Sequence, residues 1–175
     1  PSGSRQSDGV KKDPIIQVRD LHTWFKDRNS GKGEYIKAVN GVTFDIQRGE
    51  ILGLVGESGS GKSTIGRSIL KLVPVTAGEV LYQGQNLVGL ERAQMKPLRR
   101  QLQMIFQDPY ASLNPRMTVY DALAEPMLYH GVATAKDIDQ KVLTLMDDVG
   151  LERRYIRKYP HEFSGGQRQR IAIGR

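Results

Sequence analysis

Alternating apolar and polar residues predict strands in the first half of the 175-residue chain. Residues 14–25 alternate along their length, which is typical of a strand with one buried face. Residues 36–56 predict two further strands, because turn signals at Asn40-Gly41 and Arg48-Gly49 interrupt them. The stretch 78–87 predicts one more strand followed by a turn.

Two short apolar runs predict strands of a different kind. "EILGLVG" at 50–56 has no polar face, so it predicts a central strand that is buried on both sides. "LQMIF" at 102–106 predicts another short apolar strand.

Helical spacing of apolar residues appears between and after these strands. The periodic stretch 62–73 predicts a helix that Pro74 ends. The basic stretch 91–100 predicts a surface helix broken at Pro97. Three further helices are predicted at 118–129, at 135–149 and from Gln167 onward, and 1–13 is predicted to be a mobile polar tail.

The chain's first chemical motif lies between the strand at 50–56 and the helix at 62–73. "GESGSGKS" fits G-x-x-x-x-G-K-[ST], a loop whose backbone N–H groups surround phosphate oxygens at a helix N-terminus. Lys62 is predicted to reach the β- and γ-phosphates, Ser63 to ligate Mg²⁺, and Thr64 to donate a further hydrogen bond. The alternative is a Gly-rich turn without a ligand. The predicted contact residues are Gly56, Glu57, Ser58, Gly59, Ser60, Gly61, Lys62, Ser63 and Thr64.

A glutamine follows the apolar strand at 102–106. Gln107 precedes Asp108-Pro109, and an amide at a strand end can reach a metal ion or an attacking water. A surface glutamine is the commoner interpretation of such a position.

The closing "FSGGQRQR" predicts a second anion site. Gly165 and Gly166 leave N–H groups exposed where a helix begins, and Ser164 and Gln167 flank them. A simple N-cap by Ser164 is the alternative. A head-to-tail dimer explains two such sites for one nucleotide, because each nucleotide then lies between the phosphate loop of one subunit and the Ser-Gly-Gly loop of the other.

Composition narrows the class of protein. Apolar residues make up 38% and charged residues 26%, as in a globular domain, and the net charge of +7 suits phosphate-bearing partners or an anionic membrane surface. The absence of cysteine excludes disulfides and thiolate metal sites. Apolar runs are too short to span a bilayer, which needs about 20 residues.

Taken together, "GESGSGKST", "FQDP" and "FSGGQRQR" resemble the nucleotide-binding subunit of ABC transporters, over about residues 15–175. "DPYASLNPRMTV" and "YPHEFSGGQRQRIAI" are similar to ATPases of the oligopeptide/dipeptide importer group, which includes nickel and glutathione importers. Ser164 to Gln167 resemble the signature loop of this family, and Phe163 stands before them where many members have Leu.

This resemblance implies a site made of several parts. ATP and Mg²⁺ are the expected cofactors. Lys62 and Gln107 are the expected catalytic residues, with Ser63 and Gln107 holding Mg²⁺. Ser164, Gly165, Gly166 and Gln167 complete the partner's site. The family stacks an aromatic ring on adenine; Phe25 is the first candidate, because "LHTWF" lies where such rings occur, and Tyr35 is the alternative.

The resemblance also implies partners and a location. A second ATPase subunit, identical or different, and transmembrane permease subunits are expected, with a solute-binding protein as an indirect partner and no nucleic acid. The expected place is cytoplasmic, peripheral on the inner face of the cell membrane.

The family's downstream elements are not found in this sequence. An apolar strand ending in Asp-Glu and a later His are absent, and neither Asp147-Asp148 nor His161 replaces them. We therefore expect a chain truncated after the signature motif, part of a longer protein that binds ATP here but needs more residues for efficient hydrolysis.

Two alternatives to a transport ATPase remain. One is a soluble ABC-type ATPase that acts on DNA or the ribosome, although the gap between Gln107 and Ser164 is short for the arm such proteins carry. The other is a non-catalytic ATP-binding fragment.

The expected fold is α/β, that of a P-loop NTPase of the ABC type. It has an N-terminal antiparallel β part and an α-helical subdomain, and the C-terminal part of the core sheet is missing. The predicted organisation is a tail at 1–13, a P-loop core with the antiparallel β part at 14–110, a helical subdomain at 111–160, and the signature loop with the start of its helix at 161–175.

Overall fold

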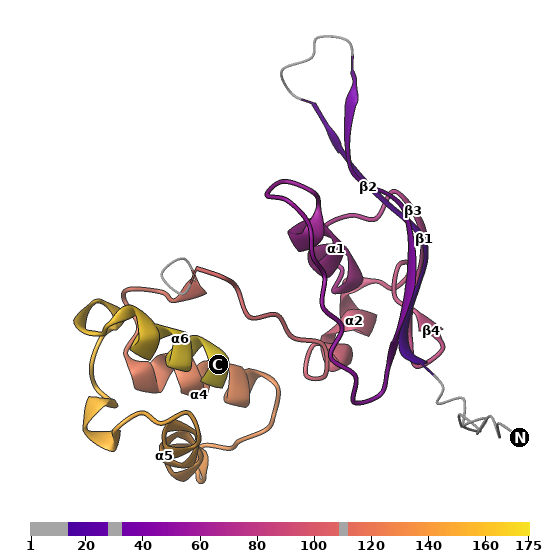
Figure 1. The fold of residues 1–175 in the computed structure, drawn as a ribbon. Helices are drawn as coiled ribbons and strands as arrows, with labels where there is room; N and C mark the ends of the chain where they lie inside the picture. The colour runs from indigo at the N-terminus through magenta and orange to yellow at the C-terminus, as the bar shows by residue number, and fades with distance from the viewer. Residues whose placement is uncertain (1–13, 28–32, 109–111) are drawn as a thin grey trace, which may run out of the picture. The chain divides into compact units, whose positions relative to one another are not determined.

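The computed structural model describes residues 14–27, 33–108 and 112–175 (Figure 1). The chain divides into two compact units, one up to Leu98 and one from Arg99 onward. The sequence placed a domain boundary at 110 instead, and the described stretch 99–108 between the two positions holds no helix or strand. The tail predicted at 1–13 lies outside the described residues.

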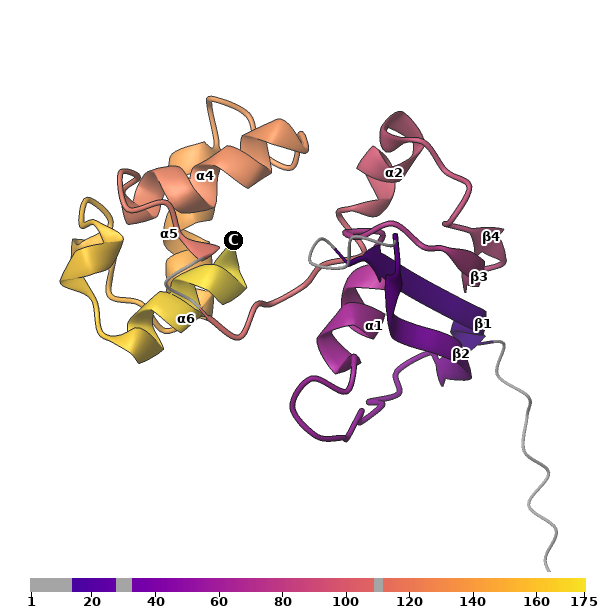
Figure 2. The same ribbon diagram turned by 90° about the horizontal axis from the view of Figure 1, so that it is seen from above.

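The first unit is built on an antiparallel sheet. Strands β1 (Pro14–Lys26), β2 (Tyr35–Gln47), β3 (Ala77–Tyr82) and β4 (Gln85–Asn86) pair in the order β2-β1-β3-β4. Figure 2 shows the sheet beside helix α1, with which β1 and β2 are in contact. The predicted antiparallel β part is therefore confirmed.

The Asn40-Gly41 pair is not a turn, contrary to the sequence-based prediction. β2 runs through both residues, and Gly41 takes a left-handed φ of 75° beside a register shift in the β1–β2 pairing. The extra residue is absorbed as a bulge, which bends a strand without ending it. The turn at Arg48-Gly49 is confirmed by a hydrogen bond from Glu50 N–H to the Gln47 carbonyl, 3.1 Å long.

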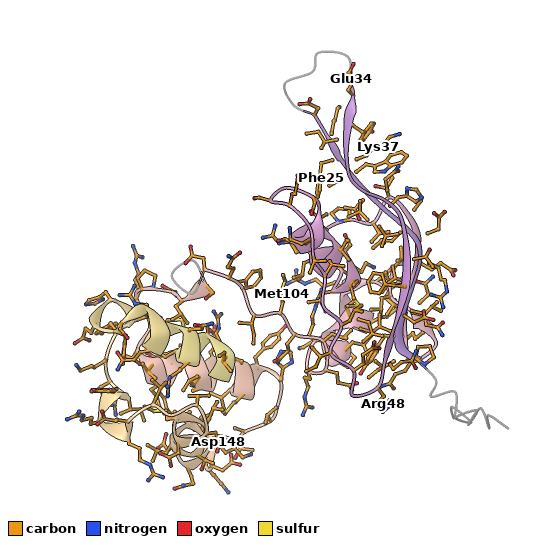
Figure 3. The ribbon with its side chains drawn as sticks, in the orientation of Figure 1. Phe25, Glu34, Lys37, Arg48, Met104 and Asp148 are labelled. Atoms are coloured by element: carbon orange, nitrogen blue, oxygen red, sulfur yellow. The ribbon has the colours of Figure 1, made fainter. Side chains whose placement is uncertain are left out.

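The strands predicted at 50–56, as a buried central strand, and at 102–106, as a short apolar strand, are also wrong for this structure. Neither stretch is a strand, and Ile51 and Val55 are 98% and 93% exposed. Ile105 and Phe106 are exposed as well, and Figure 3 labels Met104 within the same extended stretch. An extended segment needs a neighbouring strand to satisfy its N–H and C=O groups, and none of the described strands pairs with either stretch.

Helix α1 (Lys62–Ile69) joins the sheet through a buried pair of hydroxyl groups. Thr23 Oγ1 on β1 lies 2.8 Å from Ser68 Oγ on α1, and both side chains are fully buried. The helix ends before the predicted residue 73, because Lys71 adopts a left-handed φ of 51°. Helix α2 (Arg92–Leu98) accommodates Pro97 in its last turn.

Removing one or the other of these two hydroxyl groups is expected to lower the free energy of unfolding by different amounts. Ser68 Oγ donates to the Thr64 carbonyl at 2.7 Å, so the Thr23 hydroxyl must donate to Ser68. Ser68→Ala leaves a buried hydroxyl without an acceptor and is expected to lower the free energy of unfolding by about 1–3 kcal/mol. Thr23→Val removes one donor only and is expected to cost about 0.5–1.5 kcal/mol. Urea unfolding of both variants checks the order, which a larger loss in Thr23→Val would contradict.

The second unit is helical. Helices α4 (Val119–Tyr129), α5 (Ile138–Asp148) and α6 (Gly165–Gly174) contact one another around a buried apolar cluster that includes Leu123, Val142 and Met146. Short 3₁₀ turns η1 (Arg153–Tyr155) and η2 (Pro160–Glu162) connect α5 to α6. The helices predicted at 118–129 and 135–149 are thus present, the second one shorter at its start than predicted.

Candidate nucleotide-binding site

The phosphate loop lies between the extended stretch 50–56 and the first turn of α1. Gly61 is the N-cap of α1 with a φ of 91°, and a Cβ at this position would lie 2.3 Å from the Ala38 carbonyl oxygen. A Cβ at Gly56 would lie 2.7 Å from Ser60 Oγ. Only glycine fits this loop at these two ends, because any larger residue would push it away from β2 or fill its interior.

Lys62 folds back over the loop that precedes it. Its Nζ donates to the Gly56 carbonyl at 2.7 Å, to the Glu57 carbonyl, and to Ser60 Oγ at 3.3 Å. The positive charge is therefore held by the loop itself, where an entering phosphate would meet it. The role predicted for Lys62, contact with the β- and γ-phosphates, stays a prediction.

The N-terminus of α1 has no side-chain cap and no acidic residue in its first turn. The first N–H groups of a helix lack acceptors within the helix, and together they carry a partial positive charge. Ser63 is exposed and Thr64 is half-buried in this turn. The arrangement favours an anion at this helix end, as the motif predicts.

The structure separates the two aromatic candidates for adenine stacking. Phe25 lies two residues beyond Thr23 on β1, so it points to the sheet face that α1 covers. Tyr35 pairs with Lys26, and this pair lies on the opposite face with Trp24 and Lys37. Lys37 Nζ lies 4.8 Å from the centre of the Trp24 ring on that opposite face, and Figure 3 labels Phe25 and Lys37 on the two sides of the hairpin.

The Ser-Gly-Gly loop opens α6 with a reciprocal cap. Gln167 N–H donates to Ser164 Oγ at 3.4 Å, and Ser164 N–H donates to Gln167 Oε1 at 3.1 Å. The loop is fixed on both sides, because Phe163 and Ile171 are buried in the helical core. The N-cap interpretation is therefore realised, while Gly165 and Gly166 stay exposed at the helix start.

The metal ligands predicted from the sequence are oxygen atoms of neutral side chains. Ser63 and Gln107 are both exposed, and they belong to different units of the chain. Among the described residues, no group of three or more His, Asp or Glu side chains is placed to hold a metal ion. Ser63 fits Mg²⁺ because a hydroxyl at the end of a phosphate loop completes a shell that substrate phosphates mostly supply.

Two contributions to the site were missed by sequence reasoning. The Ala38 carbonyl leaves no room for a side chain at Gly61, and the hydrogen bond between Thr23 and Ser68 fixes α1 to β1. No pattern in the sequence indicates either contact. The partnership of Ser164 with Gln167 could have been found, because S-x-x-Q is the spacing of a capping box.

Comparison with known proteins identifies the family. The family profile described as ABC transporter matches residues 39–175. The chain belongs to the ABC transporter family, as an ATP-binding cassette.

Two of the chain's relatives within this family are ATP-binding proteins of glutathione import. The chain is 47% identical over 95% of its length to the glutathione import ATP-binding protein GsiA of Escherichia coli (strain K12), and 48% identical over 93% to that of Pectobacterium atrosepticum. In each case it spans 27% of the relative's length.

Solved structures agree with this fold. The dimeric post-hydrolysis state of the ATP-binding cassette MJ0796 bound to ADP and Pi has a TM-score of 0.77 at 27% identity, covering 91% of this chain and 68% of that one. CbiO1 of Clostridium perfringens, part of the ABC transporter complex CbiONQ, has a TM-score of 0.72 at 26% identity, covering 93% and 60%. The α/β fold of an ABC-type P-loop NTPase is thereby confirmed. Of the described helices, none is sufficiently long and apolar to cross a membrane.

Proposed function

We propose that this chain is the nucleotide-binding part of an ABC importer ATPase that takes up oligopeptides, dipeptides or a related solute such as glutathione. The observation that carries the proposal is the uncapped N-terminus of α1, with Lys62 held over the loop before it. Similarity to glutathione import proteins supports the choice of solute class. ATP hydrolysis coupled to uptake is proposed for the whole protein.

The roles proposed for the individual residues are those that the motifs imply. Backbone N–H groups of the loop from Gly56 to Gly61 and of the first turn of α1 bind the phosphates, and Lys62 neutralises their charge. Ser63 and Gln107 hold Mg²⁺, which when bound offsets further phosphate charge. Ser164 to Gln167 bind the nucleotide of a second ATPase subunit.

The proposed partners and place are those of a transport ATPase. A second ATPase subunit and transmembrane permease subunits assemble with the protein at the cytoplasmic face of the membrane, and a solute-binding protein acts indirectly.

Deleting the gene and measuring uptake of labelled glutathione and dipeptides in the source cells tests the proposed function. Loss of uptake that the intact gene restores supports it, and unchanged uptake of both classes contradicts it.

Phe25 is proposed to stack on adenine, in preference to Tyr35. Base stacking on an aromatic side chain is worth about 1–3 kcal/mol, so Phe25→Ala is expected to weaken ATP binding about 5- to 150-fold. Binding of inorganic triphosphate should not change, because that ligand has no base. Tyr35→Ala is the matched control in the same hairpin. Equal losses in both variants, measured by calorimetric titration, would reject the assignment.

A further inference from the structure

One strongly basic segment of the helical unit has no part in the site described above. The stretch 152–158 contains four basic residues and one acidic residue, and it includes the 3₁₀ turn η1. Backbone hydrogen bonds fix the segment to the start of α4. Val119 N–H donates to the Lys158 carbonyl at 2.9 Å, and Tyr120 N–H donates to the Ile156 carbonyl at 3.0 Å.

A tyrosine ring organises the cations of this segment. Tyr155 meets Phe163 edge to face, with 5.6 Å between ring centres, and Phe163 is buried in the helical core. The guanidinium carbon of Arg154 and the Nζ of Lys158 each lie 5.0 Å from the centre of the Tyr155 ring. The core therefore holds the ring in place, and the ring holds two cations at the surface.

The acidic neighbours of the segment do not bury its charge. Arg153 pairs with Asp147, and Arg154 pairs with Glu152 at 2.7 Å. The paired side chains are 48–70% exposed, and exposed ion pairs contribute little to stability. Phosphate groups can therefore replace these carboxylates without a large loss.

We propose that Arg154 and Lys158, which lie over the Tyr155 ring, form with the exposed neighbour Arg157 a docking surface for the headgroups of an anionic membrane. Cations on a short exposed turn match a layer of phosphates, and Lys, Arg and Tyr favour the level of lipid headgroups. The Tyr155 ring packs on Phe163 and carries two cations, so it offers no open face for base stacking, which favours a lipid surface over single-stranded nucleic acid. This inference rests on the proposed function in one respect only, namely that the protein works beside a membrane.

Two matched double variants test this surface. Arg157→Gln with Lys158→Gln removes two charges from the docking surface, while Arg116→Gln with Lys136→Gln removes two exposed charges elsewhere in the same unit. Co-sedimentation of the full chain with vesicles of 30% phosphatidylglycerol in phosphatidylcholine gives the partition coefficient. A basic residue at an anionic surface is worth about a fivefold change in partitioning, so the first variant is expected to lose about 25-fold.

Further measurements decide between the possible outcomes. Binding should require the anionic lipid and should fall as salt rises. The fold-loss in partition coefficient of the control variant Arg116→Gln with Lys136→Gln should be less than a quarter of that of Arg157→Gln with Lys158→Gln. Equal losses in the two variants, or equal binding to pure phosphatidylcholine, would overturn the proposal, as would tighter binding to duplex DNA than to the vesicles at equal phosphate. Both variants should keep ATP binding and the wild-type circular dichroism spectrum, so failure here is distinguishable from failure of the proposed function.

Discussion

Lys62→Ala is expected to weaken Mg-ATP binding about 30- to 150-fold. The Nζ of Lys62 is held at the loop by the Gly56 carbonyl and Ser60 Oγ, so its charge meets the phosphates with little reorganisation. Charge-assisted hydrogen bonds contribute about 1.5–3 kcal/mol each, and a net loss of about 2–3 kcal/mol corresponds to this change in affinity. Calorimetric titration with Mg-ATP measures it.

Lys37→Ala is the matched control for this experiment. Lys37 also lies in the first unit, but over Trp24 on the sheet face opposite α1. Removing it takes away the same charge and is expected to change affinity less than threefold, which is of the order expected for a distant exposed charge. Similar losses in the two variants would show that Lys62 acts through net charge alone.

Gly61→Ala is expected to lower the free energy of unfolding of the first unit by about 3–5 kcal/mol. The new Cβ would lie 2.3 Å from the Ala38 carbonyl oxygen, and the φ of 91° is unfavourable for alanine. Left-handed strain and overpacking each cost about 1–3 kcal/mol, which is a large share of the usual 5–15 kcal/mol of a domain. Fluorescence of Trp24, the chain's single tryptophan, reports the unfolding of this unit.

Gly89→Ala provides the control for Gly61→Ala. A Cβ at Gly89 would meet no heavy atom within 4 Å, and no left-handed φ is recorded there. Its expected effect is therefore within about 0.5 kcal/mol, as for other surface substitutions. If Gly61→Ala were as stable as Gly89→Ala, the close contact between the phosphate loop and β2 would not exist in solution.

The motifs were predictable from the sequence because their physics is local. A Gly-rich loop followed by Lys62, and a Ser-Gly-Gly loop before α6, each combine a turn with a helix start. The strands β1 and β3 and the helices α4 and α5 were also found, since one face of each is apolar and the period is clear.

The errors lie where structure depends on distant partners. The run at 50–56 has the composition of a central strand, but composition does not supply a neighbour, and Ile51 is almost fully exposed. Asn40-Gly41 has the local signal of a turn, yet pairing with β1 carries the strand through it. The sequence ranked Phe25 before Tyr35, but the opposite sheet faces of the two side chains depend on the register of the hairpin, which sequence spacing did not provide.

Hydrogen exchange of backbone amides, with and without Mg-ATP at a concentration that saturates the wild type but not Lys62→Ala, tests the central claim most directly. The account predicts that ATP protects the amides of Gly59 to Thr64 strongly, that Lys62→Ala removes this protection, and that the amides of β3 and β4 do not change. Absence of protection in the phosphate loop, or protection confined to the stretch 152–158, would contradict the assignment of this loop as the nucleotide site.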